Sequence, residues 1–402
     1  MRTTMATENN NKTLNVPNLR FPEFSGEWER SSLGVVFCKV ENGLTYDPNN
    51  SEGLPVTRIE TISDRSINYK RVGYAKDDGK LSKYKMEPGD ILFSHINSLK
   101  HIGKTAYYDG EHPLYHGMNL LLLRTTNEES ARFLFYQLNT SRFLHRCQVL
   151  ANQAVNQASI NTRELKGITL HKPSIKEQIK IADFISLLDN RIATQIKIIE
   201  KLESLIRGIS NNLLYSENGT PVRLGEILSE RSERTKVNNQ HEVLSSTVKG
   251  IFSQREYFSK DIASENNVGY KIIRLHDVVL SPQNLWMGNI NYNDKFDIGI
   301  VSPSYKIFSI ADGYDKRFVA AMLKTHRALY NYMLVSEQGA SIVRRNLNME
   351  AFEQLVFKMP PLDKQREIGN TISALQSRLE LAVRTKIAYE KQKQWLLTQI
   401  FI

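Results

Sequence analysis

The sequence has few of the residues that disulfides, metal sites and membrane spans require. It has two cysteines, Cys38 and Cys147, too few and too far apart for a zinc-ligand pattern and expected to be buried thiols. No apolar run approaches the roughly 18 residues needed to cross a bilayer. The opening residues, MRTTMATENNNKT, lack the apolar core of a signal peptide. These absences predict a cytoplasmic protein with no membrane partner.

Motifs for catalysis are also missing. The chain has no G-x-x-x-x-G-K-[ST] phosphate loop and no glycine-rich serine elbow. A methyltransferase that modifies a base amino group needs an acid or amide beside a Pro-Pro-aromatic turn, plus a glycine-rich loop for the methyl donor. The nearest fragment, Met359-Pro360-Pro361-Leu362, has no acid or amide before the prolines and no aromatic residue after them. The sequence therefore predicts no catalytic residues.

Histidines cluster in the first half, at His95, His101, His112 and His116. A metal site would need acidic or thiol ligands beside them and a helix to align the pair that is four residues apart. Pro113 and Gly117 make that segment a loop, so exposed or DNA-facing histidines are the expected arrangement, and no metal is predicted.

Negative charge is in short supply. Lys and Arg number 53 against 43 Asp and Glu, which gives a net charge of +10 and favours a polyanionic partner. The segment 173–214 is nearly balanced in charge, so the excess must lie in the globular parts of the chain, where we expect DNA to bind.

A helix-initiating Pro and Gln followed by a long apolar stripe occurs twice, from Pro173 and Gln178 and again from Pro360 and Gln365. The copies lie 360 − 173 = 187 residues apart, and their apolar residues alternate at steps of three and four, which is typical of a coiled-coil seam. Polar Gln195, Lys386 and Lys393 interrupt the stripes. The predicted seam residues are Ile185, Leu188, Ile192, Ile199, Leu202 and Ile206 in the first copy and Ile372, Leu375, Leu379 and Leu396 in the second.

The segments before the two stripes also match in register. Leu33-Gly34 corresponds to Leu224-Gly225, 86–94 to 273–281 with Asp90 over Asp277, and 131–133 to 316–318. Landmarks in the same order indicate an internal duplication, with loops of differing length.

The repeat predicts an α+β protein with two similar globular domains and two long antiparallel coiled-coil helices related by pseudo-two-fold symmetry. About 40 residues at 1.5 Å each make a rod of roughly 60 Å. Each helix packing on its own domain as a core helix is the alternative. The predicted segments are a first domain at 1–172, a helix at 173–216, a second domain at 217–359 and a helix at 360–402.

Forked donors and acceptors in loops after apolar strands are the best candidates for reading DNA bases. Three kinds of segment fit: a polar loop after an inner strand, a basic and aromatic stretch, and the amide-rich segment before each long helix. The first half contributes Lys70, Arg71, Lys76, Ser94, His95, Asn97, Lys100, His101, Lys104, Asn152 and Gln153. The second half contributes Lys249, Arg255, Ser281, Gln283, Asn284, Trp286, Gln338, Arg344, Arg345 and Asn346.

The chain resembles the specificity subunit of Type I restriction-modification systems over almost its full length. The resemblance rests on the opening 16–24 with Trp28, on Pro88-Gly89-Asp90-Ile91-Leu92-Phe93-Ser94, and on the passages 338–347 and 357–362 into the second helix. Two departures stand out: the helix openings read Pro173-Ser174 and Lys364-Gln365 where the family has Pro-Pro-Leu and Glu-Gln. In addition, His276 replaces the turn glycine found at Gly89.

The resemblance implies a non-catalytic DNA-binding subunit with two target-recognition domains. Each domain would read one half of a split, asymmetric duplex target, and the helices would set the gap and dock two adenine methyltransferase subunits. Restriction subunits would join the full complex. S-adenosylmethionine, ATP and Mg²⁺ would belong to those partners, leaving this chain without cofactors. The rival functions are a stand-alone sequence-specific DNA-binding regulator, a self-contained methyltransferase or nuclease, and a purely structural coiled-coil protein.

Overall fold

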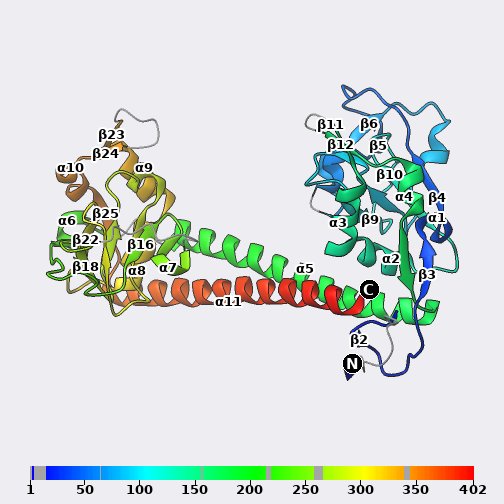
Figure 1. Cartoon of the computed structure of the whole chain (residues 1–402). Helices are drawn as coiled ribbons and strands as arrows, with labels where there is room; N and C mark the ends of the chain where they lie inside the picture. The colour runs from blue at the N-terminus through cyan, green and yellow to red at the C-terminus, as the bar shows by residue number, and fades with distance from the viewer. Residues whose placement is uncertain are drawn as a thin grey trace. The chain divides into compact units, whose positions relative to one another are not determined.

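The computed structural model describes residues 2–3, 15–63, 65–154, 157–213, 219–257, 266–338 and 345–402 (Figure 1). The chain forms two compact units. The first unit comprises Met1–Thr194 and Thr385–Ile402, and the second comprises Gln195–Arg384. The four segments predicted from the sequence give each long helix a segment of its own, whereas the compact units divide both helices.

The first unit is built around an antiparallel sheet of four strands in the order β4-β10-β7-β9. Its strands are β1 (Arg2–Thr3), β2 (Leu19–Arg20), β3 (Glu29–Ser32), β4 (Phe37–Asn42), β5 (Leu54–Val56), β6 (Gly73–Ala75), β7 (Ile91–Phe93), β8 (Ile96–Asn97), β9 (Thr105–Tyr107), β10 (Leu121–Thr125), β11 (Asn152–Ala154), β12 (Gln157–Ser159) and β13 (Thr169–Lys172). Its helices and 3-10 turns are α1 (Leu33–Val36), α2 (Ala131–Leu138), α3 (Ser141–Leu150), α4 (Thr162–Gly167), the start of α5 (Ile175–Leu213), η1 (Ile59–Ile62), η2 (Tyr69–Arg71) and η3 (Leu81–Tyr84).

The second unit repeats this sheet as β15-β22-β19-β20. Its strands are β14 (Thr220–Arg223), β15 (Leu228–Arg231), β16 (Leu244–Thr247), β17 (Gly250–Ser253), β18 (Lys271–Arg274), β19 (Val278–Leu280), β20 (Ile290–Tyr292), β21 (Ile298–Val301), β22 (Lys306–Ile310), β23 (Ser336–Gln338), β24 (Arg345–Leu347) and β25 (Val356–Met359). Its helices and 3-10 turn are α6 (Leu224–Ile227), α7 (Gln254–Tyr257), α8 (Lys316–Leu323), α9 (His326–Leu334), α10 (Met349–Glu353), most of α11 (Leu362–Ile400) and η4 (Leu285–Met287).

The two units share local detail as well as strand order, which confirms the predicted α+β class and internal repeat. Thr140 caps α3 and Thr325 caps the equivalent α9, each accepting a backbone N–H through its hydroxyl. Asn161 and Asn348 cap α4 and α10 in the same way, 187 residues apart. Equivalent caps at equivalent helix starts are what a duplicated scaffold preserves.

The Leu-Gly pair at the start of α1 and α6 recurs because a helix crosses it closely. A Cβ built on Gly34 would lie 3.2 Å from Cβ of Lys166 in α4. A Cβ built on Gly225 would lie 3.2 Å from Cβ of Glu353 in α10. The glycine therefore keeps the same two helices in close contact in both units.

The repeated Pro and Gln motif fixes the start of each long helix to its own unit. The buried amide of Gln178 accepts a hydrogen bond from Ser130 N at 3.0 Å and donates to Pro173 O at 3.0 Å. Gln365 makes the same two contacts, with Asp315 N at 3.0 Å and Pro360 O at 2.8 Å. The two departures from the family's helix openings, Ser174 and Lys364, leave both glutamines in place, so both helix starts keep the same hydrogen bonds.

The long helices α5 and α11, green and orange to red in Figure 1, expose their predicted seams less than their other faces. Ile185, Leu188, Ile372 and Leu396 are buried. The remaining predicted seam positions are half-buried: Ile192, Ile199, Leu202, Ile206, Leu375 and Leu379.

Each unit pairs the start of one long helix with the end of the other. In the first unit Lys393 forms an ion pair with Asp189, and Arg191 stacks on the ring of Tyr389 at 5.8 Å. Since 189 pairs with 393 and 191 lies over 389, the helices run antiparallel. Lys393, predicted as an interruption of the seam, thus has a partner on the other helix. Each helix packing only on its own domain is wrong for α11, which follows the second body yet ends in the first unit's core.

The turn before each inner strand needs a left-handed residue. Gly89 has φ +100°, and His276 adopts φ +76° at the same place in the second unit, where Tyr292 hydrogen-bonds its ring. The absence of glycine therefore leaves the turn intact at the cost of backbone strain.

Gly89→Ala is expected to lower the free energy of unfolding of the first unit by about 1 kcal/mol, because alanine is strained at positive φ. Gly167→Ala is the matched control, since Gly167 lies in α4 and an added Cβ would meet nothing within 4 Å. The control should be neutral or stabilising. Urea denaturation of both variants tests this, and equal effects would contradict the role assigned to the turn.

The expectation that both thiols are buried is wrong for Cys38. Cys147 is buried among the core residues of α2 and α3, and burial raises its pKa to about 12. Cys38 is exposed, because a bulge in β4 opposite Thr125 leaves it at the sheet surface. No helix in the described parts of the chain is long and apolar enough to cross a membrane.

Candidate nucleic-acid interface

In the first unit, the loop after inner strand β7 meets the hairpin that precedes the long helix. Asn97 in β8 pairs with Ala158 in β12, and β12 pairs with β11, which carries Asn152 and Gln153. Asn152 and Gln153 are exposed, as is Lys100 in the loop. Two segments predicted separately are therefore one surface, called here the first reading surface.

The second unit brings the same two segments together. Arg345 N in β24 donates to Gln283 O in the loop after β19, at 3.2 Å. The Arg345 guanidinium lies 4.9 Å from the centre of the Trp286 ring, a cation–π contact. The hairpin β23–β24 also carries Gln338 and the exposed Asn346. This second reading surface includes Asn284 and Ser281 at the start of the loop, whereas Arg344 lies outside the described residues.

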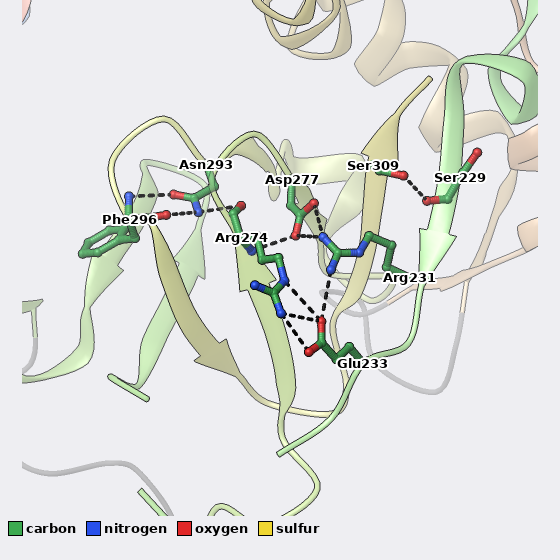
Figure 2. A network of polar contacts seen from close by, with 8 residues as sticks. All are labelled: Ser229, Arg231, Glu233, Arg274, Asp277, Asn293, Phe296 and Ser309. Carbon is green, nitrogen blue, oxygen red and sulfur yellow. Dashed lines mark hydrogen bonds and ion pairs between the residues drawn. The ribbon is translucent and has the colours of Figure 1, made fainter. Parts of the chain in front are cut away.

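A buried aspartate holds the turn behind each reading surface. Asp90 accepts from Glu87 N at 2.7 Å and from Arg124 in β10 at 2.7 Å. In the second unit Asp277 accepts from Arg274 N at 2.7 Å and from Arg231 at 2.9 Å (Figure 2). These bonds fix the turn from which strands β7 and β19 begin.

The arginine that reaches the aspartate comes from different strands in the two units. Arg124 is in β10, and its place in β22 is taken by Ser309, which Figure 2 shows beside Ser229. Arg231 enters from β15 instead and also bonds Glu233, which binds Arg274 at 2.9 Å. The charge pair is thus kept while its donor moves to the neighbouring strand.

Further residues of the two predicted basic stretches lie near the reading loops or on exposed turns. Lys70 and Arg71 are exposed in η2. Thr61 Oγ1 donates to Arg71 O at 2.7 Å, and this bond joins η2 to η1. Lys104 Nζ donates to Ser63 O at 2.7 Å, which joins η1 to the β7–β9 loop. Three other predicted residues are exposed: Lys76 just after strand β6, Lys249 in the turn between β16 and β17, and Arg255 in α7.

The four clustered histidines differ in how far they are buried. His95 and His116 are buried, and burial lowers the pKa of each to about 4. The expectation of exposed or DNA-facing histidines is therefore wrong for these two; His95 O accepts Ile160 N and supports the surface from below. His112 is exposed, and His101 is half-buried beside the loop. No group of acidic, thiol and imidazole side chains suited to a metal occurs in the described parts of the chain.

The structure adds residues that the sequence pattern missed. A cavity of about 320 Å³ lies in the first unit beside the β7–β9 loop. It is lined by Ile59, Ile62 and Ser63 together with Ser94, Asn97 and His101, among others. No motif marks the residues of η1, because only the fold brings them against a loop more than thirty positions later.

The fold and the two reading surfaces define a duplicated recognition protein whose halves share a scaffold and differ in their loops. Residues 25–204 match the Type I restriction modification DNA specificity domain family. The chain is 29% identical, over 96% of its length and 95% of the relative's, to the specificity subunit assigned to the type I restriction enzyme MjaX of Methanocaldococcus jannaschii. Its fold matches the crystal structure of a Type I restriction-modification system S subunit from M. genitalium, with a TM-score of 0.63 and 15% identity over 96% of this chain and 99% of that one.

The chain is thus similar to the specificity subunits of Type I restriction-modification systems in its sequence and in its fold. These comparisons support the specificity-subunit function over a stand-alone DNA-binding regulator.

Proposed function

We propose that each unit reads one half of a split, asymmetric duplex target. The observation that carries this proposal is that two equivalent surfaces have different side chains. The first reading surface offers Asn97 and Lys100, whereas the second offers Gln283, Trp286 and Arg345. Because different side chains select different base edges, two unlike half-sites follow.

The partners we propose are two methyltransferase subunits, docked on the long helices, and restriction subunits in the full complex. Apolar side chains off the helix seam support this proposal, since exposed apolar residues favour protein contacts. They include Leu187, Leu205, Leu381 and Ile387. The methyl donor, ATP and Mg²⁺ would bind to those partners, and the chemical steps would be theirs.

The test is to express this chain with its neighbouring methyltransferase subunit, purify the complex and map adenine methylation on a plasmid library by single-molecule sequencing. A split motif with two short, different specified halves is the expected result. Absence of a complex and of methylation, with sequence-specific binding by the chain alone, would instead favour the regulator.

A further inference from the structure

The cavity beside the first reading surface has walls that suit an anion. Lys104 supplies an ammonium group, held by its bond to Ser63 O at 2.7 Å. Asn97 Oδ1 accepts Ser98 N at 2.8 Å and Asn97 Nδ2 donates to Ser94 Oγ at 3.1 Å, so this amide has one N–H beyond these two bonds. No acidic residue is among the described residues that line it. The cavity therefore offers an ammonium group, hydroxyls and an amide, and these groups favour binding of an anionic oxygen.

The loop itself is positive. Burial, followed by the nearby charges of Lys104 and Lys100, lowers the pKa of His101. Lys100 is exposed on the same loop. These cations lie next to the hairpin that carries the amides of the first reading surface, so an anion bound here would lie beside the reading residues.

The second unit has the same backbone at this place. Ser94 N donates to Lys104 O at 2.8 Å, and Ser281 N donates to Asn289 O at 3.0 Å, so Asn289 occupies the place of Lys104. Val56 forms a parallel β-bridge with Tyr115 in the first unit, and Val243 forms the matching bridge with Ile300 in the second. Three residues after each valine come Ile59 and Ser246, so these two residues occupy the same position in the two units.

In the second unit these two positions bond to each other. Ser246 Oγ donates to Asn289 Oδ1 at 3.0 Å, and Asn289 Nδ2 donates to Ser246 O at 3.1 Å. Both residues are buried. The first unit has Ile59 and Lys104 instead, and both line the cavity. At these two positions the side chains that line the cavity are therefore particular to the first unit.

We propose that this cavity holds one phosphate of the DNA backbone, with Lys104 as its charged ligand. This inference rests on the proposed function, since it assumes that the first reading surface meets duplex DNA. It assigns Lys104 to positioning the duplex and leaves base selection to the exposed loop and hairpin.

The experiment uses the complex of the full chain with its methyltransferase subunits. Lys104→Met should weaken binding to the target and to an unrelated duplex by the same factor, roughly tenfold, because one charged hydrogen bond is lost. The slope of log affinity against log salt should fall by about 0.9. Lys166→Met removes the same charge from exposed α4 and should change neither quantity. Lys104→Arg should keep the wild-type slope.

A methylphosphonate scan of the target locates the phosphate. One neutral linkage should weaken the wild-type complex about tenfold and have no effect on Lys104→Met, since the same contact is removed twice. Ser98→Asp, which places a carboxylate at the loop, should mimic Lys104→Met. An unchanged salt slope in Lys104→Met, while the wild type binds its target, would overturn the phosphate site alone. A wild-type complex that does not distinguish any target from unrelated DNA would overturn the proposed function as well.

Discussion

Replacing Phe401 with alanine is expected to lower the free energy of unfolding of the first unit by about 3–5 kcal/mol, the usual cost of removing a buried phenylalanine. Phe401 packs against Phe133 with ring centres 5.2 Å apart and against Trp28 at 6.5 Å. Phe401 and the last residues of α11 before it thereby complete a core whose other buried members lie more than two hundred positions earlier.

Trp395→Ala is the matched control, because Trp395 lies in α11 six residues before Phe401 and is 55% exposed. Its loss should change stability by about 0.5 kcal/mol or less. Urea unfolding is followed by fluorescence in a Trp286→Phe background, because the remaining tryptophans, Trp28 and Trp395, both lie in the first unit. A Phe401→Ala loss as small as the control's would show that the end of α11 is not part of this core.

The fold was largely predictable from the sequence because its signals are local and repeated. The three-four spacing marks the helix seam, and caps such as Asn161 and Asn348 recur at a fixed offset. The pattern does not identify which body the end of α11 joins. That choice depends on aromatic packing at Phe401, a contact between distant parts of the chain.

The sequence indicates which segments form the candidate site, but it does not show that these segments lie together on one surface. A polar loop after an apolar strand identified Asn97 and Gln283, yet the pairing of each loop with the later hairpin required the structure. His95 looked like a donor in an exposed loop. His95 is buried, and its carbonyl oxygen accepts Ile160 N, a contact between distant segments that no spacing rule reveals.

Arg345 is the residue expected to carry most of the second unit's selectivity. The cap residues Asn161 and Asn348 each follow their hairpin strand, so the position three residues before them is Ala158 in one unit and Arg345 in the other. The duplicated scaffold thus places an arginine where the first unit has a methyl group. Stacking on Trp286 holds the guanidinium at the surface, and a planar fork suits the O6 and N7 atoms of guanine.

Arg345→Ala should therefore reduce affinity for the target by about tenfold to a hundredfold and broaden one base pair of one half-site. Binding to unrelated DNA should fall much less. Competition assays with target and scrambled duplexes, together with a methylation map of the variant, measure both effects, and the other half-site serves as the internal control.

Arg345→Lys separates a base contact from a phosphate contact at this position. Lysine restores the charge without the fork, so affinity for unrelated DNA should recover while the broadened base pair stays broadened. Full recovery of the methylated motif in Arg345→Lys would mean that the position contacts the backbone. In that case the two units would differ in how they grip the duplex at this point and not in what they read, and selectivity would lie with Gln283 and its loop neighbours.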